Sequence, residues 1–403
     1  MRLLPLLLTS ILALSACFGG GDGQAPTPAA SARLQADAGP DRWRPLPPAG
    51  PVPAEVAAAR LALLGPDSTR PDQVKVWWVG VSSFIVSAGG HLFLLDAWEV
   101  VGVHRGYVPL TRDDLVAIRP AAIFIGHGHF DHAADAGYVA SRTGAALIAG
   151  SSVCDTARRK VGQHAGDTTF SCLRLGLDAD FPAGTTFPVR VFADLPPVHI
   201  VKHTHSAADP ADLAKGGTPL LYVPEVLPYL FNLNLDLGEI LAFVQSLPED
   251  GGVGQPEGGT WAYHFRAGDF SLLWHDSTGQ MVDGDPDAEA IRRSLRQLPG
   301  CVDVQLGAIV GFGMVTSGYR DALAYVEAAQ PRLFIPNHHD AWFPVIGGGA
   351  AAYEQQWTAQ LNSLPFPPQQ DYLRDPEDYL IARVFDTRDP RWRAPRPAGD
   401  CRS

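Results

Sequence analysis

The chain has 403 residues, of which 46% are hydrophobic and 18% charged, and its formal net charge is -12. A chain of this length and composition can bury a full hydrophobic core without a disulfide scaffold. Its acidic balance argues against nucleic acid as a partner, because binding phosphates requires a basic face. A small anionic substrate remains allowed, since a bound metal ion can supply local positive charge.

The first residues have the pattern of an export signal. Arg2 precedes an apolar run over residues 3–14 that is too short to span a bilayer. The stretch LSAC at residues 14–17 resembles the cleavage box of bacterial lipoproteins, in which the cysteine becomes the lipidated first residue. This resemblance implies export and an acyl anchor on Cys17 with no spanning helix, and Phe18 favours the periplasmic side of the outer membrane. An ordinary signal with an incidental cysteine is the alternative.

A change in composition marks the domain boundaries. Residues 18–53 are rich in Gly, Pro and Ala, which is typical of a flexible linker between an anchor and a domain. We therefore expect a signal with its lipidated cysteine over residues 1–17, one globular domain over residues 54–390 and a tail over residues 391–403. An apolar insertion near residues 220–258 is either a cap that receives an acyl chain or a helix pair buried in the core.

Four cysteines remain after the signal, and none forms a C-x-x-C pair. A thiolate metal site is therefore not expected. In an oxidising compartment an even number allows two disulfides in three possible pairings, with inert buried thiols as the alternative. These cysteines are Cys154, Cys172, Cys301 and Cys401.

Strands and helices alternate along the domain, which predicts an α/β layered fold. A helix is expected from Ala54 through Leu64, followed by two β-rich runs that Gly89 and Gly90 join as a hairpin. Gly144 closes another expected helix. Further helices are expected over residues 112–118, 133–144, 286–298 and 319–330, and strands over residues 121–126, 145–150, 189–193, 198–202, 270–274, 302–310 and 332–336.

A cluster of histidines directly follows the strand expected over residues 121–126. The sequence IGHGHFDHAAD places His127, His129, Asp131 and His132 within six residues. A lone histidine is usually an ordinary surface or core residue, but three crowded imidazoles without a metal would repel one another when protonated. Neutral imidazole and carboxylate are the ligands that borderline divalent ions prefer, zinc above all. The cluster therefore predicts a metal site.

This H-x-H-x-D-H pattern resembles the signature of the metallo-β-lactamase superfamily. The resemblance covers most of the chain from about residue 74 to residue 342 and implies a four-layer αββα sandwich. It also implies three further ligands, each at the end of a strand: Asp276 in HDSTG as a bridging carboxylate, His338 in IPNHHDAW as the last ligand, and His205 in VKHTHS as the third histidine. His203 remains an alternative to His205. His339 is then either a group behind the ligands or a surface residue.

The hairpin before the cluster resembles a narrower branch, that of N-acyl-phosphatidylethanolamine phospholipases and a sugar-phosphate lactonase. That branch often has Gly-His-Ser/Ala-Ser/Thr, where this chain has GVSS at residues 80–83, so the histidine is missing. Asp96 matches the hairpin aspartate of the superfamily, which orients a metal ligand without binding the metal itself. A plain turn residue is the alternative role for Asp96.

The resemblance implies a two-metal hydrolase. His127, His129 and His205 would bind one ion, Asp131, His132 and His338 the other, and Asp276 would bridge them. Two zinc ions, or manganese or ferrous ions, would turn a shared water into a hydroxide nucleophile, with Asp131 as a catalytic proton acceptor. We expect cleavage of a phosphodiester, lactone or related ester or amide in a small-molecule or lipid-like substrate. The alternatives are a non-catalytic envelope lipoprotein that binds a ligand and an iron-dependent oxidoreductase.

Overall fold

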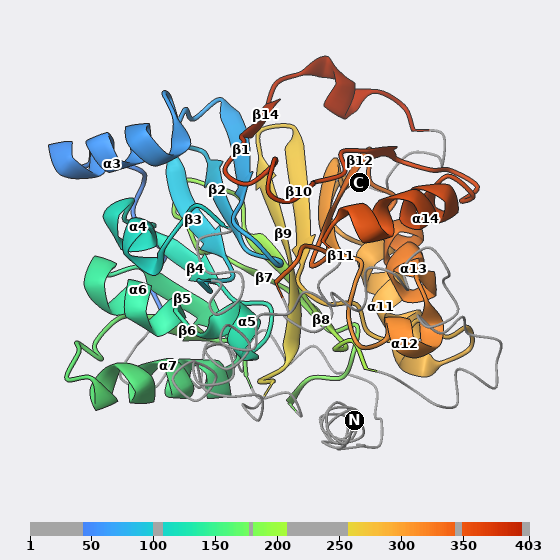
Figure 1. The fold of residues 1–403 in the computed structure, drawn as a ribbon, viewed down its shortest axis with the longest axis horizontal. Helices are drawn as coiled ribbons and strands as arrows, with labels where there is room; N and C mark the ends of the chain where they lie inside the picture. The colour runs from blue at the N-terminus through green and yellow to red at the C-terminus, as the bar shows by residue number, and fades with distance from the viewer. Residues whose placement is uncertain (1–42, 100–107, 177–179, 208–256, 343–348, 397–403) are drawn as a thin grey trace, which may run out of the picture.

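Two seven-stranded sheets lie face to face in the computed structural model, which describes residues 43–99, 108–176, 180–207, 257–342 and 349–396 (Figure 1). The first sheet is antiparallel from β14 to β3 and parallel from β3 to β6. Its strands, in spatial order, are β14 (Arg383–Asp386), β1 (Gln73–Trp78), β2 (Phe84–Ala88), β3 (His91–Leu95), β4 (Ala122–Phe124), β5 (Ala146–Ala149) and β6 (Cys172–Arg174).

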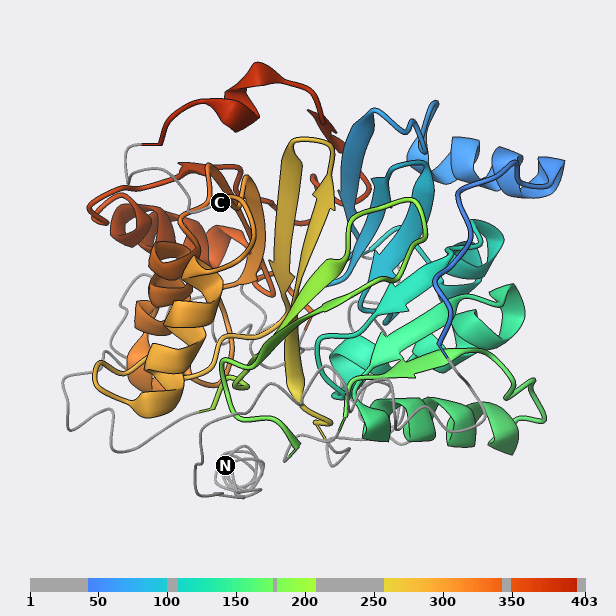
Figure 2. The same ribbon diagram turned by 180° about the vertical axis from the view of Figure 1, so that it is seen from behind.

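The second sheet repeats this plan, antiparallel from β7 to β10 and parallel from β10 to β13. Figure 2 shows its long central hairpin from behind. Its strands, in spatial order, are β13 (Gln369–Gln370), β12 (Leu333–Asn337), β11 (Val304–Ala308), β10 (Phe270–His275), β9 (Thr260–Ala267), β8 (Val198–His203) and β7 (Thr186–Val189).

Helices cover the outer face of each sheet, so the predicted four-layer αββα sandwich is confirmed (Figure 1). The helices on the side of the first sheet are α3 (Ala54–Leu64), α4 (Arg112–Ala117), α5 (Phe130–Ala133), α6 (Ala136–Thr143) and α7 (Ser151–Gln163). Those on the side of the second sheet are α11 (Pro286–Arg296), α12 (Met314–Ser317), α13 (Arg320–Ala329) and α14 (Ala351–Leu361), and the short 3-10 helix η4 (Pro390–Arg393) follows β14.

Aromatic side chains join the two sheets. Phe93 and Phe124 of the first sheet meet Phe265 of the second, with ring centroids 5.1 Å and 4.9 Å apart, and all three belong to one buried core. The outer face of the second sheet has a separate apolar core against α11 and α13. Every residue of β2, β3, β10 and β11 is buried, as expected for strands with a layer on both faces.

Several local expectations are confirmed. The first helix has the predicted bounds, and Gly89 and Gly90 form the hairpin turn with φ of 57° and 88°, which non-glycine residues rarely adopt. The strand expected over residues 189–193 is wrong: β7 ends at Val189. Because Val189 pairs with Val198, the residues between them must form the reversal into β8.

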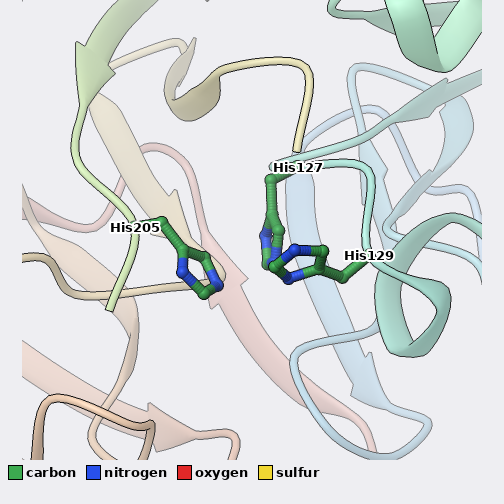
Figure 3. A group of neighbouring side chains, drawn as sticks. All are labelled: His127, His129 and His205. Atoms are coloured by element: carbon green, nitrogen blue, oxygen red, sulfur yellow. The ribbon is translucent and has the colours of Figure 1, made fainter. Parts of the chain in front are cut away.

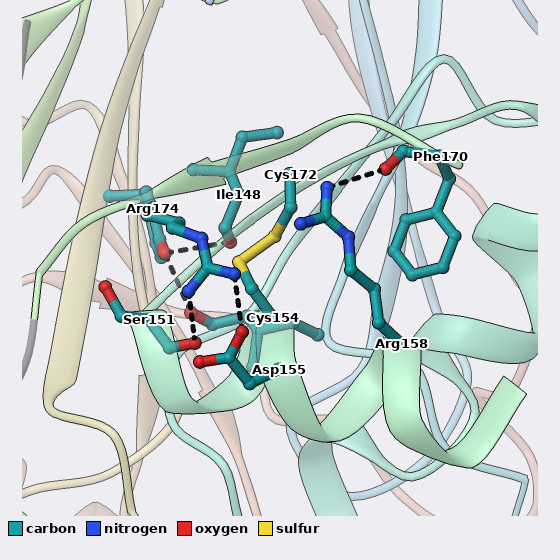
Figure 4. Close-up of a disulfide and its surroundings, with 10 residues drawn as sticks. Ile148, Ser151, Cys154, Asp155, Arg158, Phe170, Cys172 and Arg174 are labelled. Atoms are coloured by element: carbon teal, nitrogen blue, oxygen red, sulfur yellow. Dashed lines mark hydrogen bonds and ion pairs between the residues drawn. A yellow bond between two sulfur atoms is a disulfide. The ribbon is translucent and has the colours of Figure 1, made fainter. Parts of the chain in front are cut away.

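A disulfide joins Cys154 of α7 to Cys172 of β6, with the Cα atoms 6.1 Å apart (Figure 4). Beside it, the guanidinium of Arg174 donates to the backbone oxygen of Ser151 and pairs with Asp155. Cys301 is also disulfide-bonded. Of the two possibilities that the sequence allows for the cysteines, disulfides rather than free thiols are therefore present.

Replacing both Cys154 and Cys172 by alanine should lower the free energy of unfolding by about 3 kcal/mol, because the bond closes a loop of 18 residues in the unfolded chain. Denaturant titration of the wild type and the variant measures this loss. Adding reductant to the variant isolates what the Cys301 bond contributes. Equal stability of the wild type and the variant would show that the bond between Cys154 and Cys172 does not restrain the unfolded chain.

Candidate metal centre

The predicted site residues meet at the carboxyl ends of strands from both sheets. Asp96, Asp276 and His338 each directly follow a strand, namely β3, β10 and β12, and His205 lies two residues beyond β8. The segment after β4 supplies His127 and His129, and the single turn of α5 supplies Asp131 and His132. The strands before these residues are almost wholly buried, so they fix where the chain leaves the sheet and where these side chains begin.

His127, His129 and His205 form the first group, shown in Figure 3. His127 Nε2 lies 2.9 Å from His129 Nδ1. The ring of His205 lies 4.5 Å from that of His127 and 4.7 Å from that of His129, centroid to centroid. One ligand atom from each ring lies within 4.8 Å of the others, as binding of a single ion requires.

Asp131, His132 and His338 form the second group. Oδ2 of Asp131 lies 3.2 Å from His132 Nε2 and 3.5 Å from His338 Nε2. The rings of His132 and His338 are stacked, with centroids 5.2 Å apart. All three residues are buried.

Asp276 lies between the two groups and is fully buried. Its Oδ2 is 2.6 Å from Nδ1 of His127 and 3.4 Å from Nδ1 of His132, so it contacts one residue of each group. Its Oδ1 accepts no hydrogen bond from any residue that the structure describes. A buried carboxylate oxygen without a donor is costly, and a cation would satisfy it.

Asp96 holds His132 from behind. Nδ1 of His132 lies 2.7 Å from Oδ2 of Asp96, which also accepts from the hydroxyl of Ser82 at 2.7 Å. Oδ1 of Asp96 accepts from the N–H of Gly126 at 3.0 Å. Because Nδ1 faces this carboxylate, Nε2 of His132 is directed toward Asp131, which is the usual way in which an outer carboxylate orients a histidine ligand.

The backbone of His338 has an unfavourable conformation, which contacts with neighbouring groups stabilise. Its φ is 63°, and Val81 and Asp96 also have positive φ, which costs free energy in residues other than glycine. The N–H of His338 donates to Val81 O at 2.8 Å, and the N–H of Val81 donates to the carboxylate of Asp340. Tyr379 donates its hydroxyl to the same carboxylate at 2.6 Å.

The charges of the cluster follow from its burial. Burial lowers the pKa of His127 and His205 well below the usual value, and neighbouring imidazoles lower it further. Burial also opposes charge on His132, but the carboxylates of Asp131 and Asp96 outweigh it and raise its pKa well above the usual value. Burial, aided by the charge of Asp276, raises the pKa of Asp96 to about 7. Burial lowers the pKa of His129 too, so the rings of His127, His129 and His205 are neutral and able to bind a metal ion.

The structure separates the cluster from the other histidines. His205 lies in the cluster, whereas His203 is directed to the helix side of the sheet, where its Nδ1 is 3.0 Å from the hydroxyl of Tyr325. His339 is buried behind His338 and donates to Leu373 O at 2.8 Å while its ring stacks on Trp78. His339 is therefore a buried residue behind His338 and not a surface residue.

Three residues that help to build the site were not predicted. Ser82 bonds Asp96, Asp340 holds Val81, and Gly126 leaves room for Asp276. Ser82 and Asp340 belong to the motifs GVSS and IPNHHDAW. Their places in these motifs could have indicated that they lie near the site. Gly126 stands between the buried strand and the first histidine, where a glycine often marks a close approach of two chain segments.

The donor set fits a divalent metal ion such as zinc. The described residues offer three groups of at least three ligand atoms, and all of these groups belong to this cluster. Imidazole nitrogens and carboxylate oxygens are the ligands that zinc, manganese and ferrous ions accept. That these side chains bind metal, and that Asp276 bridges two ions, stay predictions.

Fold and site together define an αββα sandwich with a buried histidine and aspartate cluster where its two sheets meet. No family model matches the chain. Curated proteins described as UPF0173 metal-dependent hydrolases are similar to it. The one from Pyrobaculum aerophilum is 33% identical over 75 residues, which are 19% of this chain and 32% of that protein. The one from Anaeromyxobacter sp. (strain K) is 27% identical over 286 residues, which are 68% of this chain and 78% of that protein.

The chain thus spans about a third of the length of the Pyrobaculum relative. Among solved structures, the metallo hydrolase Igni18 from Ignicoccus hospitalis has a TM-score of 0.47 and 15% sequence identity, with 78% of this chain and 98% of that chain covered.

Several expectations concern residues outside the described ranges. The export signal, Cys17, the first part of the linker and nearly all of the apolar insertion lie there. In the part of the chain that the structure describes, no helix is both long and apolar enough to cross a membrane.

Replacing Gly126 by alanine should destabilise the protein by about 1–3 kcal/mol, as overpacking of a buried site does. A Cβ at this position would lie 2.0 Å from Cγ of Asp276, so either the carboxylate or the backbone must move. Thermal unfolding measures the change. Gly162→Ala in α7 is the matched control, because its Cβ would meet only a side-chain methyl at 3.5 Å. A melting temperature of Gly126→Ala at or above that of the wild type would contradict the close approach.

Proposed function

We propose that the chain is a metal-dependent hydrolase that binds two divalent ions, zinc above all, and cleaves a phosphodiester, lactone or related ester or amide bond. The observation that carries the proposal is the convergence of seven side chains from four separate parts of the chain into three overlapping ligand groups. The descriptions of the similar proteins as metal-dependent hydrolases support it. The same ligand set would serve an iron-dependent oxidoreductase, which the metal content would reveal.

The roles of the residues follow from their positions. When bound, metal ions supply an activated water and polarise the bond to be broken. The neutral rings of His127, His129 and His205 would hold one ion through their nitrogens. The carboxylate of Asp131 and the rings of His132 and His338 would hold the other. Oδ2 of Asp131 faces both His132 and His338, and we propose that it accepts the proton released in the reaction. Asp96 keeps His132 in orientation.

We also propose that the protein is exported and held at the periplasmic face of the outer membrane by acyl chains on Cys17. The disulfide between Cys154 and Cys172 supports an oxidising compartment, since such bonds persist there and are rare in the cytosol. A membrane-tethered enzyme would meet small or lipid-like substrates. The net charge of -12 supports a partner other than nucleic acid.

Purified protein lacking the signal should contain close to two zinc ions per chain by elemental analysis. His127→Ala and Asp276→Ala should each lower this content, because each removes a ligand that contacts other members of the cluster. His205→Ala should lower it as well. His203→Ala is the matched control, since this histidine lies on the same strand end but bonds Tyr325, and it should keep the metal.

The outcomes distinguish the alternatives. Iron in place of zinc would favour redox chemistry on the same ligands. A wild-type protein that binds no metal, and takes up none on reconstitution, would overturn the hydrolase proposal and leave a binding scaffold. Metal loss in His203→Ala but not in His205→Ala would exchange their proposed roles.

The metal-loaded protein should hydrolyse at least one member of a panel of chromogenic phosphodiesters, lactones and esters, and a chelator should abolish this activity. Asp131→Asn should reduce turnover by about 10²–10⁴-fold if the carboxylate transfers a proton. Turnover rates normalised to bound metal are the measurement, so that metal loss is not mistaken for a catalytic defect. Undiminished turnover per metal would exclude Asp131 as the proton acceptor.

A further inference from the structure

Three loops are joined by hydrogen bonds behind His205. The N–H of Ser206 donates to Oγ of Ser277 at 3.0 Å, and the N–H of Gly313 donates to Oγ of Ser206 at 2.8 Å. Both serines are only 5% exposed. Because Ser206 follows His205 and Ser277 follows Asp276, the first of these bonds ties together the segments that carry two members of the cluster.

These loops also pack closely against one another. A Cβ on Gly279 would lie 2.0 Å from Oγ1 of Thr204, and a Cβ on Gly311 would lie 2.5 Å from Oγ of Ser206. With any larger residue at either glycine, this glycine segment or the segment around His205 would have to shift. The Gly311-Phe312-Gly313 stretch therefore has a packing role at this junction.

His275 fixes the other side of Ser277. Its Nδ1 lies 3.0 Å from Ser277 O, and since a carbonyl oxygen can only accept, Nδ1 carries the proton. Nε2 is then free to accept from the side-chain amide of Gln305 at 2.9 Å. Gly307 makes room for the ring, because a Cβ there would lie 2.7 Å from Nε2.

We propose that Ser277 is a positioning residue, whose hydroxyl holds the backbone beside His205 at a set distance from Asp276 while His275 holds the backbone carbonyl of Ser277. In this way Ser277 determines how tightly the group of His127, His129 and His205 binds its metal ion. The proposal rests on the proposed function for the identity of the ligand, but not on hydrolysis. Ser277 acts through the N–H of Ser206 and through the main chain beside Asp276. Groups that hold metal ligands in place typically change metal affinity by about 10–100-fold when removed.

The test is a competition titration of metal-free protein with Zn²⁺ against a chromophoric chelator. Ser277→Ala should weaken the tighter or the weaker of the two binding steps by about 10–100-fold, and Ser277→Thr, which keeps the hydroxyl, should restore it. Ser271→Ala is the matched control. This serine lies on β10, the strand that precedes Ser277, and it is 4% exposed. Its hydroxyl accepts from the N–H of Asp303 at 3.0 Å, at the end of β10 away from the cluster.

A double-mutant cycle separates positioning from general destabilisation. If Ser277 acts through His205, then Ser277→Ala should change zinc affinity much less in a His205→Ala background than in the wild type. Equal losses in both backgrounds, or equal losses in Ser277→Ala and Ser271→Ala, would overturn the positioning role. So would unchanged affinity in Ser277→Ala. A protein that binds zinc but hydrolyses nothing would overturn the proposed function and leave this result standing.

Discussion

The close approach of Gly126 to Asp276 is the constraint on which the site depends. Gly126 stands at the end of the first sheet and Asp276 at the end of the second, and a single Cβ would close the space between them. The N–H of Trp261 donates to Gly126 O at 2.8 Å, so backbone also joins the two sheets here. His127, the next residue, contacts the same carboxylate. The spacing of the cluster is therefore set by how the two sheets pack.

Burying so many polar groups is unfavourable unless they satisfy one another. Around Asp96 this condition is met, since the carboxylate bonds His132, Ser82 and the N–H of Gly126. Around Asp276 it is met only in part, because Oδ1 has no hydrogen-bond donor among the described parts of the chain. The positive φ of His338 adds strain that the Asp340 interactions offset. A positive charge at the place where the ligand atoms converge would therefore stabilise the carboxylate of Asp276.

Sequence patterns predict the layered fold well because fully buried strands give continuous apolar runs and glycines mark the turns, as at Gly89 and Gly90. They did not reveal β9, α7 or α14. The candidate ligands are predictable from a dense local motif and from their place after strands. The choice between His203 and His205 depends on which face of β8 meets the helices, and the role of Gly126 depends on contact between sheets. Neither is encoded in local periodicity.

Each ligand group takes residues from both sheets. His127 and His129, which follow β4 of the first sheet, meet His205, which follows β8 of the second. Asp131 and His132, in the helix after β4, meet His338, which follows β12 of the second sheet. A small shift of one sheet against the other would therefore open both groups at once. Conversely, an ion bound to either group would link the two halves of the sandwich, and its binding free energy would add to the stability of the fold. Binding of a metal ion would therefore also favour the packing between the two sheets.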